Sequence, residues 1–357
     1  MSLLSVSQLK AGMILADDIY IFDNKLLLPK DTELTDYMIN KLGFYSVKNV
    51  KVQDSALSET GPVSEQEESY SRRLRHSQEF KAFKEEFFKN LYVLKTEFLD
   101  ITNENEKIRP NEFLNRIDSI IQSAGSINVF DMLHCMREYD DSTFVHALNT
   151  ALICHVFGHW INLEESDLNI LTLSGLLHDI GKIRVSDTIM KKTEQLSSAE
   201  RTLVQAHTIY GYEILKNQDI DERIKLTALM HHERCDGTGY PKAYRASQIT
   251  DFAKIVGMVS EYDSLTSSRP YRKAACPFDV IKQFELEGLQ KFETRYILTF
   301  LERISNAFIN HTVLLNNGKK AEIIMINKQF LSKPTVKCRD SFIDLTKTKD
   351  LYIKAVV

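Results

Sequence analysis

Helical hydrophobic periodicity covers most of this chain, from about residue 72 to about residue 310. Its clearest segment is an apolar stripe whose members recur at intervals of three and four residues: Phe80, Phe83, Phe87, Leu91 and Leu94. This spacing places the side chains on one face of a helix. The stripe fits packing within a core, and it could also pair two copies of the chain in a homodimer. The pattern predicts a mainly α protein with a large helical middle region.

The first 53 residues differ from this helical region because they contain short strand-like runs. The segments 13–16 and 26–28 are apolar, 46–52 alternates with a period of two, and 36–42 is typical of a helix. The segment 54–71 is acidic and contains serine, glycine and proline, as a solvated linker does. We therefore expect a small β-rich N-terminal domain at 1–53, followed by a linker.

After residue 310 the pattern returns to short β-rich runs, at 312–315, 321–326 and 351–356. Asn316-Asn317-Gly318 lies between the first two runs and is a hairpin signal. Together these patterns predict a large helical region at 72–310 and a short β-rich C-terminal extension at 311–357.

Charge and cysteine content exclude several classes of protein. The net charge of −4 disfavours a nucleic-acid polymer as partner, so the positive charge for a phosphate ligand must be local. The five cysteines form no Cys-x-x-Cys pair, and their odd number argues against a disulfide framework. No apolar run reaches about 18 residues, and the start lacks a signal-peptide pattern. We therefore expect a cytoplasmic protein without a membrane span.

The pair His178-Asp179 follows a leucine-rich segment at 168–177 that predicts a buried helix. A charge at the end of such a helix needs strong partners, because an unpaired buried charge is costly. Imidazole nitrogens and carboxylate oxygens form a ligand set for iron, manganese or zinc, and one carboxylate can bridge two ions. Further histidines in the helical region supply additional candidates: His146, His207, His231 and His232. A buried ion pair with a hydrogen-bonded histidine is the alternative interpretation.

Two further segments offer groups that could bind a phosphate or a base. Gly239 and Tyr240 follow the His231-His232 pair, and a glycine lets the backbone approach a ligand or adopt positive φ. The Tyr240 ring could stack on a base. Arg269, Arg272 and Lys273 concentrate positive charge, and guanidinium groups suit phosphate oxygens and guanine edges. The alternatives are a surface turn and an ordinary basic loop.

Together these segments resemble the HD-GYP family of cyclic dinucleotide phosphodiesterases, whose catalytic domain belongs to the HD superfamily of metal-dependent phosphohydrolases. The resemblance covers roughly residues 140–310, and several rare motifs occur in the right order. It implies an all-helical domain at 140–310, preceded by a helical connecting region at 72–139. The matching segments are His146, Leu176 to Lys182, His207, His231 to Glu233, Asp236 to Pro241 and Arg269 to Arg272.

The resemblance implies a metal-dependent enzyme that cuts cyclic di-GMP to pGpG or GMP in bacterial second-messenger signalling. It implies a centre of two or three divalent ions, most commonly iron or manganese, held by His146, His178, Asp179, His207, His231 and His232. It also implies that Lys182 approaches the scissile phosphate and acts in catalysis with Asp179. By the same resemblance, Gly239, Tyr240, Arg269 and Arg272 contact the substrate.

Two positions depart from the family pattern. Ser260 stands where the family usually has an aspartate ligand, and Asp263, one helical turn on, is the candidate replacement. Glu261 is adjacent but points about 100° away on a helix. Ser142, after Asp140 and Asp141, replaces an acidic ligand of three-metal members. The alternative function is therefore a non-catalytic receptor for cyclic di-GMP or a protein-interaction module, and an HD phosphohydrolase for another nucleotide is a third possibility.

Overall fold

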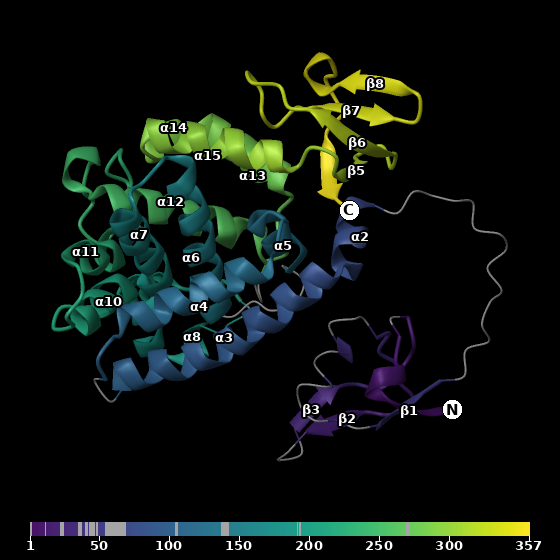
Figure 1. Ribbon diagram of the computed structural model, residues 1–357, viewed down its shortest axis with the longest axis horizontal. Helices are drawn as coiled ribbons and strands as arrows, with labels where there is room; N and C mark the ends of the chain where they lie inside the picture. The colour runs from purple at the N-terminus through teal and green to yellow at the C-terminus, as the bar shows by residue number, and fades with distance from the viewer. Residues whose placement is uncertain are drawn as a thin grey trace. The chain divides into compact units, whose positions relative to one another are not determined.

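The structure is a computed structural model in which two compact units, Met1–Glu67 and Glu68–Val357, are distinguished. It describes residues 2–10, 12–21, 25–34, 38–39, 42, 47, 49–53, 69–103, 106–136, 143–190, 192, 194–268 and 272–357. The expected fold class is confirmed, because the described chain is mainly α-helical with β-rich segments towards both ends (Figure 1). In the described residues, no helix is both long and apolar enough to cross a membrane.

The N-terminal unit contains two antiparallel strand pairs. β1 (Ser2–Ser5) pairs with β4 (Asn49–Val52), and β2 (Ile19–Ile21) pairs with β3 (Lys25–Leu28). A 3-10 helix, Val6–Gln8, follows β1. The strands expected at 26–28 and within 46–52 are present. The run 13–16 is not a strand, since Ile14 and Leu15 form only isolated bridges.

Two expectations for the first 71 residues fall partly outside the described residues. In the segment 36–42, residues 38, 39 and 42 are helical and the others are not described. The expected linker is described only from residue 69 onwards. There α2 (Tyr70–His76) has already begun, with the Ser69 hydroxyl accepting a hydrogen bond from the Arg72 amide at 3.4 Å. A serine N-cap of this kind satisfies a helix-end amide, so the helical region begins two residues earlier than expected.

The apolar stripe predicted at 80–94 lies on α3 (Gln78–Asn103) and is buried along its whole length. Its side chains join the core of their own unit, together with those of α4 (Pro110–Ser123) and α5 (Val129–Met136). Phe80, for example, is 2% exposed. The stripe therefore packs within one copy of the chain, and its apolar area is not available to pair two copies.

α6 (Thr143–Trp160) and α7 (Glu165–Leu177) form the centre of the helical region and pack against each other. Both are buried on nearly all sides, as helices without a polar face must be. Both also contact α12 (Asp251–Thr266), and α7 contacts α11 (Glu222–Met230). The remaining helices are α8 (Asp187–Met190), α9 (Ser198–Gln205), α10 (His207–Leu215), α13 (Pro277–Gln283), α14 (Leu289–Lys291) and α15 (Thr294–Ala307).

The C-terminal extension is a five-stranded antiparallel sheet in the order β8-β7-β6-β5-β9. Its strands are β5 (Thr312–Leu315), β6 (Lys320–Met325), β7 (Thr335–Cys338), β8 (Ser341–Asp344) and β9 (Ile353–Val356). The hairpin expected at 316–318 joins β5 and β6, with φ of +82° at Gly318. Val313 and Leu315 belong to the core that the helices form, so the sheet is continuous with the helical region.

Candidate metal centre

A buried carboxylate, Asp179, lies where four helices deliver histidines. His178 is the C-terminal cap of α7, and Asp179 leads directly into the 3-10 helix Ile180–Arg184. His146 comes from α6, His207 opens α10, and His231 caps the end of α11. These five side chains are at most 4% exposed. Segments far apart in the sequence thus bring the predicted ligands together.

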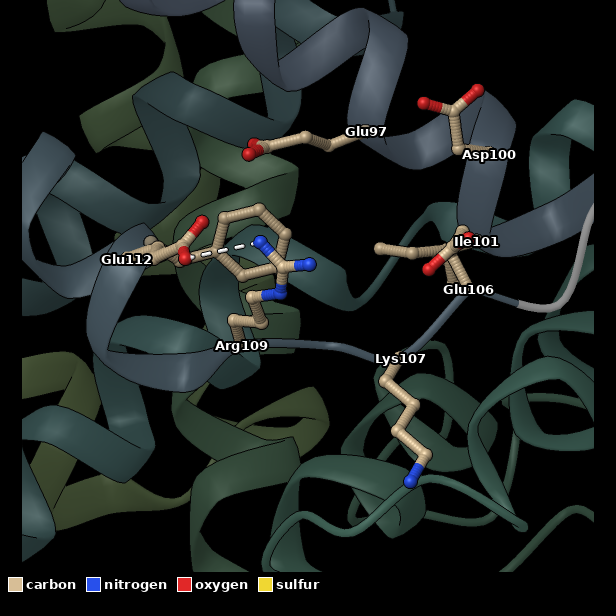
Figure 2. Close-up of a pocket in the computed structure, with 8 residues that line it drawn as sticks. Glu97, Asp100, Ile101, Glu106, Lys107, Arg109 and Glu112 are labelled. Atoms are coloured by element: carbon tan, nitrogen blue, oxygen red, sulfur yellow. Dashed lines mark hydrogen bonds and ion pairs between the residues drawn. The ribbon is translucent and has the colours of Figure 1, made fainter.

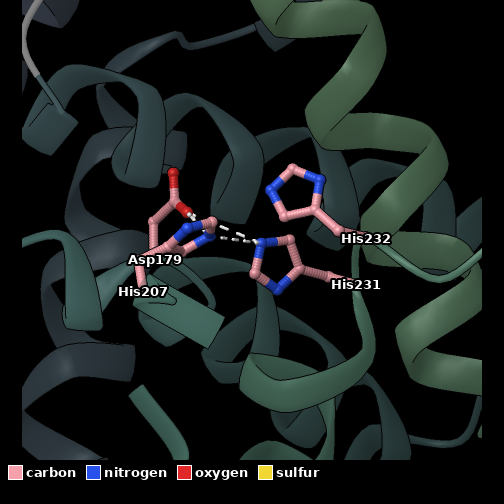
Figure 3. A group of neighbouring side chains, drawn as sticks. All are labelled: Asp179, His207, His231 and His232. Carbon is pink, nitrogen blue, oxygen red and sulfur yellow. Dashed lines mark hydrogen bonds and ion pairs between the residues drawn. The ribbon is translucent and has the colours of Figure 1, made fainter. Parts of the chain in front are cut away.

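Four imidazole Nε2 atoms surround the Asp179 carboxylate. They lie 3.7 Å away for His146, 3.4 Å for His178, 3.2 Å for His207 and 3.5 Å for His231. His232, which is partly buried, completes a four-residue group with Asp179, His207 and His231 (Figure 3). A second group contains His146, His178 and Asp179. The two groups share Asp179, and a shared carboxylate is the usual bridge of a two-ion centre.

The other ring nitrogen, Nδ1, is occupied by an acceptor in each of the four histidines nearest Asp179. The acceptors are the Asp263 carboxylate for His146 at 2.7 Å, Gly175 O for His178 at 2.7 Å, Val204 O for His207 at 2.6 Å and Ala228 O for His231 at 3.1 Å. An Nδ1 that donates its proton leaves Nε2 with a lone pair in the neutral ring. This is the tautomer that binds a metal, and such hydrogen bonds also orient the ring.

The nitrogen and oxygen atoms that face each other in this centre have more lone pairs than there are protons to form hydrogen bonds between them. His207 Nε2 and His231 Nε2 face each other at 3.3 Å, although both Nδ1 atoms already hold the ring proton. His178 Nε2 and Asp179 Oδ1 are buried without a hydrogen-bond partner among the described residues. Unsatisfied acceptors of this kind are costly in a protein interior. A cation bound between them would satisfy these atoms, and the imidazole and carboxylate donors suit iron, manganese or zinc.

The pKa values of these groups favour the protonation states that a metal site requires. Burial holds the pKa of His178 well below its usual value and lowers the pKa of His231 to about 4. Burial alone would raise the pKa of Asp179, but Lys182 and the neighbouring histidines outweigh it and hold that pKa well below its usual range. At neutral pH His178 and His231 are therefore neutral and Asp179 is ionised.

Ser260 and Asp263 lie on either side of the His146 ring. The Ser260 hydroxyl is 3.1 Å from His146 Nε2, whereas Asp263 is on the Nδ1 side and also accepts a hydrogen bond from Asn149 at 3.2 Å. Asp263 is not part of either metal-binding group found in the described chain. Its position favours orienting His146 over binding an ion directly. Glu261 is paired with Arg234, which explains why it does not replace the missing carboxylate.

The loop after His232 is held by a residue to which sequence analysis assigned no role. Both carboxylate oxygens of Glu233 accept backbone hydrogen bonds, from Lys242 at 2.7 Å and from Tyr244 at 2.9 Å. Glu233 is 5% exposed. Its place between a histidine pair and a glycine-rich turn was the available signal. Because these bonds close the loop onto the end of α11, Glu233 positions Tyr240 beside the histidines.

Tyr240 lies against the group of Asp179, His207, His231 and His232. Its ring stacks on His232 with centroids 4.6 Å apart and an angle of 19°. Burial raises the pKa of its hydroxyl, so the hydroxyl keeps its proton at neutral pH. Gly239 has a different environment from the expected one, because an added Cβ would lie 2.4 Å from Arg234 N and Glu233 Cα. The close backbone approach is therefore to the chain itself, and Gly237 supplies the positive φ of +83°.

Lys182 lies beside the centre, with Nζ 2.5 Å from Asp179 Oδ2. The backbone turn that brings it there requires a glycine at 181. A Cβ at Gly181 would lie 2.0 Å from His207 O and 2.4 Å from Gly211 N. Gly181 is not the residue that ends α7, since that helix already ends at Leu177. Gly181 instead allows the 3-10 helix to pack directly against α10, where His207 lies.

The expected basic group is described only in part. Arg272 donates a hydrogen bond to the Ser264 carbonyl oxygen at 2.5 Å, near the end of α12. Arg269 lies outside the described residues, as do Asp140, Asp141 and Ser142. The expectations for these positions therefore stay predictions.

A pocket near the junction of α3 and α4 is chemically different from the metal centre (Figure 2). It is lined by Glu97, Asp100, Ile101, Glu106, Lys107, Arg109, Glu112 and Phe113. Four carboxylates face two cations, and Arg109 is paired with Glu112 at 3.2 Å. A surplus of negative charge repels phosphate groups, so this pocket does not suit an anionic nucleotide.

Comparisons with known proteins agree with the geometry. Residues 135–294 match the family described as HD domain. The cyclic di-GMP phosphodiesterase PdeB of Borreliella burgdorferi is 28% identical over 192 residues, which cover 54% of this chain and 51% of that protein. The cyclic di-GMP phosphodiesterase PA4108 of Pseudomonas aeruginosa is 28% identical over 203 residues, covering 57% and 49%. The chain thus spans about half the length of these curated relatives.

Two further similarities concern the ligand class and the fold. The 3'3'-cGAMP-specific phosphodiesterase 3 of Vibrio cholerae is 35% identical over 134 residues, covering 38% of this chain and 29% of that protein. A solved structure described as an HDG"Y"P protein from Bdellovibrio bacteriovorus has a TM-score of 0.50 at 13% identity and covers 85% of this chain and 99% of that one. At this identity the solved structure supports the fold alone.

Proposed function

We propose that this chain, whose residues 135–294 match the HD domain family, is a metal-dependent phosphodiesterase that hydrolyses cyclic di-GMP to pGpG, GMP or both. The proposal rests on one observation above all, the four Nε2 atoms that surround the Asp179 carboxylate with their Nδ1 protons directed elsewhere. The activities named for the relatives support a cyclic dinucleotide as substrate. We assign the catalytic region to residues 140–310 and its role to bacterial second-messenger signalling.

We infer that the two groups around Asp179 hold two divalent ions, iron or manganese. His207, His231 and His232 would hold one ion with Asp179, and His146 and His178 would hold the other. When bound, such ions supply an activated water and neutralise charge on the phosphate. Lys182 adds a positive charge beside the same carboxylate, where the negative charge that develops on a phosphodiester needs stabilisation. Asp263 keeps the His146 ring in its binding orientation.

The substrate's bases would lie on the side of the centre where Tyr240 stacks on His232. An aromatic ring in this position can stack on a purine base. Gly239 shapes this loop, and Arg269 and Arg272 are proposed to bind phosphate oxygens or guanine edges. Selectivity between cyclic di-GMP and a cyclic GMP-AMP would depend on contacts to the second base.

A second function is favoured by one contact, the Ser260 hydroxyl at 3.1 Å from His146 Nε2. A serine supplies neither the charge nor the second oxygen of a carboxylate. If the group of His146, His178 and Asp179 does not retain an ion, the domain would bind cyclic di-GMP without cutting it. It would then act as a receptor or protein-interaction module.

Elemental analysis and a hydrolysis assay on the same sample distinguish the two functions. The full chain is loaded anaerobically with Fe²⁺ or with Mn²⁺, its metal content is measured, and cyclic di-GMP and 3'3'-cGAMP are offered separately. Two equivalents of metal with turnover of cyclic di-GMP support the enzyme. Tight binding of cyclic di-GMP without turnover under either metal supports the receptor and refutes the enzyme.

A further inference from the structure

A second histidine pair lies on α6, away from the Asp179 centre. His155 and His159 are four residues apart, and their Nε2 atoms are 3.2 Å from each other. Their ring centroids are 4.8 Å apart. His155 follows His146 by nine residues, which corresponds to about 13 Å along the helix and about half a turn around it. The pair therefore faces the opposite side of α6 from the ligand His146.

The hydrogen bonds around His155 fix its tautomer. The Thr172 hydroxyl donates to Leu168 O at 2.8 Å, so its oxygen can only accept from the imidazole. His155 Nδ1, 3.3 Å from that oxygen, is therefore the protonated ring nitrogen. The lone pair of His155 Nε2 then points at His159. An oriented ring with a free Nε2 lone pair is the arrangement that metal-binding histidines show.

The surroundings of the pair carry negative charge. Asp118 on α4 and Glu165 at the start of α7 both act electrostatically on His155, and both are exposed. α4 and α7 each contact α6. His155 is half-buried and His159 is exposed, so an ion between them would remain accessible from solvent and could keep water ligands.

We propose that His155 and His159 form a second metal site that binds Zn²⁺ or a similar divalent ion, such as Ni²⁺ or Cu²⁺. Two histidines at i and i+4 on one helix face are a known zinc-binding arrangement. Imidazole ligands favour zinc, nickel and copper over magnesium or calcium. Water would complete the coordination, because no carboxylate of the described residues forms a metal-binding group with these two imidazoles. The competing arrangement is an ordinary hydrogen bond from His159 Nε2 to His155 Nε2, with no affinity for a metal.

Equilibrium dialysis against buffered Zn²⁺, followed by elemental analysis, tests this site. The wild-type full chain is compared with H159Q, which changes an exposed side chain, and with H76Q, which removes an exposed histidine on α2. We expect the wild type and H76Q to bind one more equivalent than H159Q. A Thr172→Val variant, which keeps both histidines but removes the acceptor for His155 Nδ1, should bind that equivalent roughly 10-fold more weakly.

Two further measurements separate this site from the Asp179 centre. Asp179→Asn should retain the extra equivalent, and H159Q should keep the wild-type rate of any cyclic di-GMP hydrolysis. Untagged wild type should be retained more strongly than H159Q on an immobilised Ni²⁺ column, because two neighbouring imidazoles bind an ion more tightly than the single exposed His76 that H159Q keeps. Equal zinc content in wild type and H159Q, or equal column retention, would overturn the proposal whatever the outcome for hydrolysis.

Discussion

Asp179, which is buried, and Asp131, which is 12% exposed, have pKa values that are shifted in opposite directions. The pKa of Asp179 is held well below its usual range, while burial raises the pKa of Asp131, on α5, to about 6. Asp179 has Lys182 at 2.5 Å and four imidazole Nε2 atoms within 3.7 Å. Asp131 accepts one hydrogen bond from the Tyr70 hydroxyl at 3.0 Å, and His311 Nε2 lies 3.9 Å away.

The difference shows that burial alone does not determine what a buried carboxylate does. Burial lowers the pKa of His311 to about 4, and it raises the pKa of Tyr70 to about 12, so both neighbours of Asp131 are neutral at pH 7. Desolvation therefore outweighs the hydrogen bond from Tyr70 and raises the pKa of Asp131. Around Asp179 the cation and the converging nitrogens outweigh desolvation. The cluster around Asp131 is thus structural, and the cluster around Asp179 has the charge of a metal centre.

Removing each carboxylate should separate the two clusters most clearly. Asp179→Asn takes the shared ligand from both metal-binding groups, so metal content should fall and cyclic di-GMP hydrolysis should drop at least ~10²-fold, as when a major transition-state contact is lost. Asp131→Asn is the matched control and should keep both. Elemental analysis and initial rates are measured on the same preparations. Equal metal content in the two variants would contradict the assignment of Asp179.

The contribution of Asp131 to the stability of the folded protein should depend on pH. The folded-state pKa of about 6 lies above the usual aspartate value of 3.8. The stabilisation by the protonated carboxyl is therefore complete below about pH 4 and is lost as pH rises through 6. The loss from this side chain amounts to at most about 3 kcal/mol. Asp131→Asn, which cannot ionise, should therefore gain stability relative to wild type between pH 4.5 and 7.5.

Urea unfolding in the presence of a chelator measures this difference without a contribution from bound metal. Tyr70, His311 and the nearby Arg73, which acts on Tyr70, are unchanged in both proteins. A difference in unfolding free energy that stays constant with pH would show that Asp131 is ionised throughout.

Gly181 and Gly211 allow a second comparison. Both lie where the 3-10 helix packs against α10, and the Asp179 centre depends on this contact. Gly181→Ala should cost roughly 1–3 kcal/mol of stability, since the new Cβ meets backbone atoms of His207 and Gly211. Gly211→Ala is the control from the other side of the same contact, where the nearest atom is 3.4 Å away. Chemical unfolding of both variants gives the comparison, and equal losses would exclude a special role for Gly181.

Sequence predicted the parts of this molecule that repeat or that carry a rare motif. The stripe on α3 was predictable because burial imposes one period along the whole helix. β7 and β8 were missed, since they are four residues each and β8 has no buried side chain to create an alternating pattern.

The sequence indicated by residue type and order which histidines would lie near Asp179, whereas it did not indicate the orientation of their rings. Gly175 O and Val204 O fix the His178 and His207 rings, and a backbone carbonyl leaves no signature in the sequence. The position of Asp263 behind His146 depends on how α12 packs against α6. Such tertiary contacts decide which carboxylate binds an ion and which one only orients a ligand.

Ser260 allows the smallest change that would make the two metal-binding groups more alike. Ser260→Asp places a second carboxylate beside His146 Nε2, in a position that is 5% exposed. We expect the second equivalent of Mn²⁺ to bind roughly 10-fold more tightly. The same substitution should destabilise the metal-free protein, because the new charge is buried near Asp179 and Asp263 without a cation.

Ser260→Asn is the control for this change, since it has similar size but no charge. For the aspartate variant, metal affinity measured by calorimetry should therefore rise, while the free energy of unfolding measured in chelator should fall. For the asparagine variant both quantities should hardly change. If the aspartate variant binds the second equivalent no more tightly, the three-residue group already holds its ion adequately. Asp263, acting through His146, would then account for the missing carboxylate, and the two groups would differ in residues but not in affinity.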